Sequence, residues 1–101
     1  MDENQFAYYF FILHQKQIKQ DLQIKYIDTD ITVQTIADFI RKNNMLQKFK
    51  KCQDLIHNKK IYSKIIYGLQ TAIQQNISLK ITADEYIKHL ENKLYKHSYI
   101  E

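Results

Sequence analysis

The stretch Ile81-Thr82-Ala83-Asp84-Glu85-Tyr86 marks the beginning of a helix more clearly than any other part of the chain. Thr82 and Glu85 have the spacing of a capping box, in which each side chain accepts a hydrogen bond from the backbone N–H of the other residue. Ile81 and Tyr86 occupy the positions of a hydrophobic staple around the box. A helix is therefore predicted to follow, with one apolar face made by Tyr86, Ile87, Leu90 and Leu94.

Another helix is predicted directly upstream of this start. It begins near Lys60 and ends at Asn76, because asparagine tolerates the left-handed backbone conformation that stops a helix. Asn58 separates it from the preceding segment. The residues Ile77–Ile81 have no obvious strand partner and are predicted to form a loop. The apolar face of this helix is made by Ile61, Ile65, Leu69, Ala72 and Ile73.

The N-terminal part of the chain predicts a long first helix. It begins near Asp2 or Glu3, where a negative charge suits the positive end of the helix dipole. Its segment Phe6–Leu13 is apolar all round and is expected to lie in the middle of the core. The rings of Tyr8 and Tyr9 are expected to be buried there with their hydroxyl groups in water.

A second helix is predicted after the break at Asp28-Thr29-Asp30, with Thr32 as its N-cap. Asn43-Asn44 marks a kink or a stop in this helix. The apolar pattern resumes beyond the two asparagines, as either a short third helix or the second half of a bent one. The residues that carry it are Leu46, Phe49, Gln53 and Ile56.

These elements predict an all-α fold in a single domain of residues 1–101. The chain has no proline and only one glycine, Gly68, whereas an all-β fold of this size needs many tight turns. The expected architecture is an antiparallel four-helix bundle, with helix two kinked or split so that five helices can be counted.

The sequence offers no residue set for catalysis, for a cofactor or for a metal. The single cysteine, Cys52, excludes a zinc site built on several cysteines and is interpreted as a small buried residue. The four histidines lack a recognised ligand spacing and are interpreted as surface residues. We therefore expect a binding protein that is not an enzyme and has no small-molecule substrate. The histidines are His14, His57, His89 and His97.

Positive charge is concentrated in the middle of the chain. The whole chain has a net charge of +4, whereas residues 41–64 hold eight basic residues against Asp54 alone, a net charge of +7. Such a stretch favours an acidic partner: nucleic acid, an anionic membrane surface or an acidic protein. The candidate basic face consists of Arg41, Lys42, Lys48, Lys50, Lys51, Lys59, Lys60 and Lys64.

The beginning of the chain predicts a cytoplasmic location. Met1-Asp2-Glu3 is acidic, whereas a signal peptide begins with basic residues. The apolar run Phe6–Leu13 is too short to span a bilayer. The lone cysteine is also typical of a reducing compartment.

Several features of the second half resemble the immunity proteins of pediocin-like (class IIa) bacteriocins. Ile61-Tyr62-Ser63-Lys64 leads into Leu69-Gln70-Thr71-Ala72-Ile73, a loop follows, and the capped start at Thr82 opens the last helix. An aromatic tail over His97–Glu101 completes the pattern, which covers roughly residues 60–101.

The resemblance implies a small basic cytosolic four-helix bundle that protects a bacterium. Such a protein acts at the inner face of the membrane, where it blocks the complex of bacteriocin and sugar-uptake permease. Peripheral contact with anionic lipid would involve the basic face. The C-terminal half would carry specificity, with Tyr95, His97, Tyr99 and Ile100 as the candidate residues.

Two other functions stay open. In the first, the protein binds nucleic acid: Ile31–Asn43 resembles the first helix of a helix-turn-helix, and Lys48, Lys50 and Lys51 would fall on the recognition helix. In the second, it is a protein-binding inhibitor or assembly subunit, such as a phage anti-defence protein.

Overall fold

The computed structural model describes the backbone of residues 2–48 and 52–99, and within these segments it leaves out the side chains of residues 48, 52, 53, 89 and 93–99. The described elements are five α-helices and one short 3₁₀ helix, so the all-α class is confirmed. In chain order they are α1 (Glu3–Asp21), α2 (Thr29–Lys42), η1 (Leu46–Lys48), α3 (Cys52–Ile56), α4 (Lys59–Gln74) and α5 (Ala83–Tyr99).

The first two helices begin at aspartates. The backbone N–H of Gln5 donates to the Asp2 carboxylate at 2.8 Å, and the Gln5 side chain accepts from the Asp2 N–H at 3.1 Å. Asp28 caps α2 by accepting from the N–H of Ile31 at 3.0 Å. The prediction that Thr32 is the N-cap is therefore wrong. Thr32 lies one turn inside α2, fully buried, and its hydroxyl donates to the Asp28 carbonyl at 2.6 Å.

Asparagines end or begin the helices in the middle of the chain. Asn44 and Asn76 have φ angles of 51° and 65°, the left-handed region that terminates helices. Of the two alternatives at Asn43-Asn44, a kink or a stop, the structure shows the stop, and η1 and α3 follow it as separate elements. Asn58 caps α4, since its side-chain oxygen accepts from the N–H of Lys60 at 2.8 Å.

The capping box at the beginning of α5 is confirmed. The N–H of Thr82 donates to the Glu85 carboxylate and the N–H of Glu85 donates to the Thr82 hydroxyl, both at 3.2 Å. The predicted aromatic tail differs, because the helical backbone continues through His97 to Tyr99.

The loop before α5 has a backbone partner that the sequence did not reveal. The N–H of Asp28 donates to the Leu79 carbonyl at 2.9 Å, and the N–H of Ile81 donates to the Tyr26 carbonyl at 3.3 Å. Leu79 is fully buried. The loop is therefore attached to the segment that joins α1 to α2.

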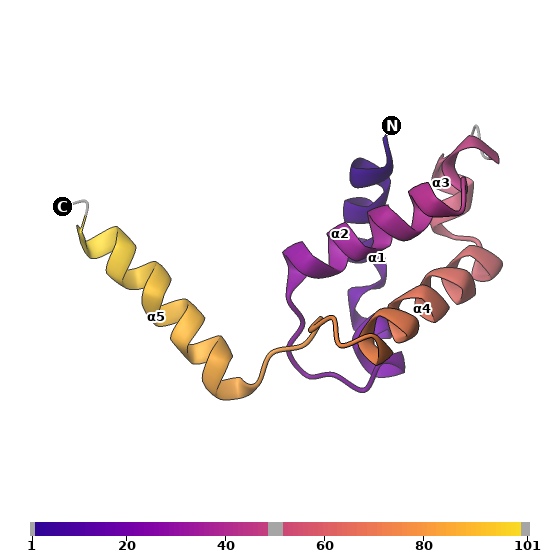
Figure 1. The fold of residues 1–101 in the computed structure, drawn as a ribbon. Coiled ribbons are helices and arrows are strands. Elements are labelled where there is room, and N and C mark those ends of the chain that lie inside the picture. The colour runs from indigo at the N-terminus through magenta and orange to yellow at the C-terminus, as the bar shows by residue number, and fades with distance from the viewer. Residues whose placement is uncertain (1, 49–51, 100–101) are drawn as a thin grey trace.

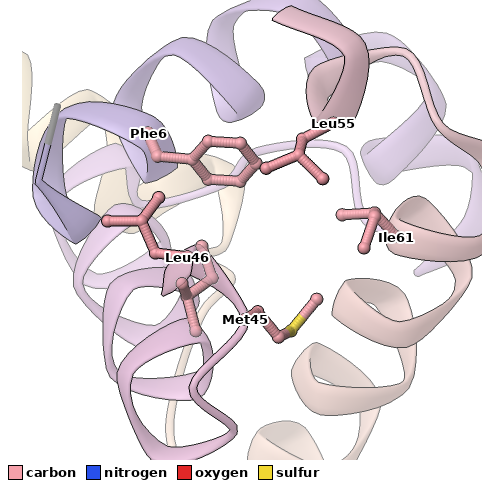
Figure 2. A pocket seen from close by; sticks show the side chains of 6 residues that line it. Phe6, Met45, Leu46, Leu55 and Ile61 are labelled. Atoms are coloured by element: carbon pink, nitrogen blue, oxygen red, sulfur yellow. The ribbon is translucent and has the colours of Figure 1, made fainter. Parts of the chain in front are cut away.

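The core lies among α1, α2, α3 and α4. Figure 2 shows apolar side chains from α1, the α2–η1 turn, η1, α3 and α4 pointing toward one small space, which leaves no room for a water molecule. The expectation that Phe6–Leu13 lies in the middle of the core holds for one face only, because within it Phe6, Ala7, Phe10 and Phe11 alone are buried. Tyr8 and Tyr9, which were expected to be buried, are about half exposed.

The expected four-helix bundle is only loosely supported. Helices α1, α2 and α4 pack together with the short α3, whereas α5 extends away from them on its own (Figure 1). None of the described side chains of α5 is buried.

Candidate binding surface

The first half of α5 carries an apolar face that is largely uncovered. Tyr86, Ile87 and Leu90 lie on it and are 37%, 52% and 42% exposed. An amphipathic helix in a globular protein ordinarily buries such a face against the core. We name these three residues the α5 face, and their exposure makes them a candidate binding surface.

The base of α5 is held against the segment that joins α1 to α2. The ring of Tyr86 stacks on that of Tyr26, with 4.7 Å between the ring centroids and 11° between the ring planes. Directly before α5, the backbone of Ile81 is bonded to the Tyr26 carbonyl. These contacts anchor the first turn of α5 while the rest of the helix extends away (Figure 1).

A hollow of about 480 Å³ opens between the beginning of α2 and the first turns of α5. Ile27, Tyr86 and Leu90 contribute apolar surface to it, and Asp30 and Glu85 contribute carboxylates. A surface of this composition suits an amphipathic segment that carries apolar and basic side chains. The hollow is lined by Ile27, Asp28, Thr29, Asp30, Ile81, Glu85, Tyr86 and Leu90.

The predicted basic face is distributed over two helix ends. Arg41 and Lys42 are exposed at the end of α2, and Arg41 forms an ion pair with Asp38 at 3.0 Å. Lys59, Lys60 and Lys64 are exposed on the first turns of α4. Both ends lie on the same side of the molecule in Figure 1. Of the remaining predicted residues, Lys48 ends η1 with its side chain outside the described part, and Lys50 and Lys51 lie outside it altogether.

Lys59 and Lys60 occupy an electrostatically unfavourable position. They stand in the first turn of α4, which contains no acidic residue. The beginning of a helix is its positive end, so a cation there is disfavoured by roughly 0.3–1 kcal/mol. Arg41 and Lys42 have the opposite relation to α2, because they stand at its negative end. The two lysines of α4 are therefore slightly unfavourable for the stability of the helix.

Between these two helix ends is a second hollow of about 480 Å³. Asn43 lines it from the end of α2, and Lys64 and Tyr67 line it from α4. Its other lining residues are Phe39, Met45, Ile61 and Ser63. The hollow places one lysine of the basic face beside an aromatic ring and an amide, all accessible to a partner.

The predicted C-terminal specificity residues are located only by their backbone. Tyr95, His97 and Tyr99 belong to α5, and their side chains are outside the described part. Ile100 is outside it as well. The structure therefore places three of these residues on the same projecting helix as the α5 face.

Titratable side chains gather at one further place, where α1, α3 and α4 meet. The Nε2–H of His14 donates to the Ile56 carbonyl at 2.6 Å. The Tyr62 hydroxyl donates to the Asp21 carboxylate at 2.5 Å. Phe10 packs against both rings. These hydrogen bonds and ring contacts join the three helices.

Replacing Tyr62 with phenylalanine is expected to make the free energy of unfolding fall less steeply as the pH rises into the alkaline range. Burial, followed by the Asp21 carboxylate, raises the pKa of the Tyr62 phenol above its ordinary value. The neutral phenol therefore stabilises the fold fully below about pH 10, the pKa of an unfolded tyrosine. This contribution is lost as the pH rises through the higher folded pKa.

The measurement is the urea midpoint of unfolding at pH values between about 8 and 11, around the ordinary tyrosine pKa. Tyr67→Phe is the matched control, because Tyr67 lies on the same helix and is 69% exposed. Parallel curves for Tyr62→Phe and the unmodified protein would show that this phenol does not govern the alkaline loss.

The described residues hold no group of three or more histidine, cysteine or acidic side chains arranged to bind a metal ion. The predicted burial of Cys52 falls on a side chain outside the described part.

The helix-turn-helix hypothesis requires a recognition helix after α2. Within the described segments, the next α-helix after α2 is α3, which has five residues, Cys52–Ile56.

The sequence did not reveal that the α5 face is exposed or that a hollow lies beside it. Tyr86, Ile87 and Leu90 were identified as one apolar face, but apolar periodicity predicts burial and does not show which faces lack a partner.

A scan against models of known protein families found no match to this chain. Neither a search of curated proteins nor a search of solved structures found a similar protein.

Proposed function

We propose that this protein is a non-enzymatic binding protein that takes up a segment of a protein partner against α5. The observation that carries the proposal is the uncovered α5 face on a helix anchored at its base and projecting from the core. In this mode of recognition an amphipathic segment of the partner lays its apolar face on apolar side chains such as the α5 face and the hollow beside it.

The basic face supports a second, weaker contact with an anionic surface. Each lysine or arginine near an anionic membrane contributes about 1 kcal/mol of attraction, which salt screens. In the described part of the chain, no helix has both the length and the apolarity to cross a bilayer. The proposed membrane contact is peripheral and uses the ends of α2 and α4.

The specific form of this function is bacteriocin immunity. The protein acts in the cytoplasm at the inner membrane face and binds the complex of a class IIa bacteriocin with its permease. Support comes from the resemblance over residues 60–101 and from the placement of Tyr95, His97 and Tyr99 on the projecting helix.

The test is protection of a bacteriocin-sensitive bacterium that expresses this chain. Expression is expected to raise the bacteriocin concentration required to kill half of the cells. Leu90→Asp should abolish this protection, because it places a charge in the α5 face. Asn92→Asp is the matched control, since residue 92 is exposed on the same helix and lies away from that face.

Two outcomes would contradict the proposal at different levels. If the unmodified chain protects against no class IIa bacteriocin, the immunity function is wrong. If Leu90→Asp protects as well as Asn92→Asp, the α5 face is not the binding surface. Circular dichroism of both variants confirms that each remains helical.

A further inference from the structure

The side of α1 that faces away from the core forms an apolar surface. Tyr8, Tyr9, Ile12 and Leu13 are 51%, 54%, 44% and 49% exposed. In a helix, residues three and four apart are neighbours, so these four side chains form one continuous patch over two turns. We name them the α1 outer face. Neither α5 nor any other described element covers it.

The α1 outer face has two different halves along the helix axis. Tyr8 and Tyr9 form the half nearer the beginning of α1, and their rings meet edge to face with 5.8 Å between centroids. Ile12 and Leu13 form the half nearer its end. An aromatic pair is thus followed by an aliphatic pair of similar extent.

The charges that flank this face differ in sign at its two ends. Asp2 and Glu3 stand at the beginning of α1, and Lys16 and Lys19 stand beyond the aliphatic pair. Reversing the direction of the helix exchanges acid for base and aromatic for aliphatic. A second α1 that lies antiparallel to the first is therefore complementary to it in both respects.

We propose that the α1 outer face is the interface of a homodimer in which two α1 helices pack antiparallel about a twofold axis. The aromatic pair of each copy lies on the aliphatic pair of the other. The acidic beginning of each helix lies beside the basic end of the other. An isologous contact requires this kind of self-complementary surface.

The α1 outer face is small for a dimer interface. A fully buried tyrosine covers roughly 150–250 Å², so half-exposed Tyr8 and Tyr9 each have on the order of 100 Å² left to bury. With the aliphatic pair and the flanking residues, the two copies together bury on the order of 1,000 Å², near the lower end of specific interfaces. The dimer is therefore expected to dissociate on dilution.

Sedimentation equilibrium of the full chain over a wide concentration range tests the proposal. The average mass is expected to rise from 12.3 kDa toward twice that value as concentration increases. Ile12→Glu should keep the protein monomeric at every concentration, because it places two carboxylates at the centre of the interface. Tyr67→Glu is the matched control on α4, and it should dimerise like the unmodified chain.

The charge pattern distinguishes the antiparallel arrangement from others. Lys16→Glu with Lys19→Glu should weaken the dimer at low salt, because both ends of each helix are then acidic. Adding Asp2→Asn and Glu3→Gln should restore part of the affinity, because it removes the negative charges that repel the new glutamates of the other copy. Asparagine caps a helix as well as aspartate does, so α1 keeps its beginning.

A further variant separates this interface from the α5 face. Ile87→Asp with Leu90→Asp is expected to leave the dimer intact. Loss of the dimer in this variant would mean that α5, from the same or another copy, occupies the α1 outer face. A protein that stays monomeric at all concentrations, or an Ile12→Glu variant that still dimerises, would also overturn the proposal. Loss of bacteriocin protection has no bearing on these outcomes.

Discussion

Replacing Phe10 with alanine is expected to destabilise the fold by about 3–5 kcal/mol. Phe10 is completely buried and packs against the rings of Phe6, His14 and Tyr62, at centroid distances of 6.1, 4.6 and 5.9 Å. Truncation leaves a cavity where α1 meets α4. Because domains of this size have a total stability of about 5–15 kcal/mol, the variant is expected to lose a large share of it.

Urea unfolding followed by circular dichroism measures this loss. Tyr67→Ala is the control, since it also removes an aromatic ring but from an exposed position. Substitutions at such positions usually change stability by no more than about 0.5 kcal/mol. Equal effects of the two substitutions would show that Phe10 does not lie at the centre of the core.

The helix ends were largely predictable from sequence because their determinants are local. The box of Thr82 and Glu85 and the stops at Asn44 and Asn76 involve residues within one turn of the boundary. The beginning of α2 was placed wrongly because Asp28 and Thr32 are both good capping residues. Asp28 caps the helix. The Thr32 hydroxyl can be buried without an unsatisfied hydrogen bond, because it donates to the Asp28 carbonyl one turn back.

Which side of each helix is buried was less predictable from sequence, because it depends on segments distant along the chain. The run Phe6–Leu13 has no polar side to indicate its orientation, so α2 and α4 determine which residues are buried. The position of α5 depends on the Tyr26–Tyr86 stack, a contact across sixty residues of chain. The described residues of the basic face lie at exposed helix ends. The exposure of the α5 face, in contrast, became visible only in the structure.

Replacing Gly68 with alanine is expected to destabilise the protein by up to about 2 kcal/mol, as the difference between two opposing effects. Alanine favours an interior helix position over glycine by roughly 1 kcal/mol. However, an added Cβ would lie 2.5 Å from Cδ2 and 2.8 Å from Cγ of Phe39. Because Cγ is attached directly to Cβ of Phe39, rotating the ring about its own axis does not remove the clash. Overpacking of this kind costs about 1–3 kcal/mol.

A double-mutant cycle separates the two effects. In the Phe39→Ala background the ring is absent, so Gly68→Ala should stabilise the protein by up to about 1 kcal/mol through helix propensity alone. The sign of the Gly68→Ala effect on the free energy of unfolding is therefore expected to reverse between the two backgrounds. Stabilisation in both would mean that α2 and α4 do not require the close approach at Gly68. Destabilisation in both would mean that Gly68 is needed for a reason other than the Phe39 ring.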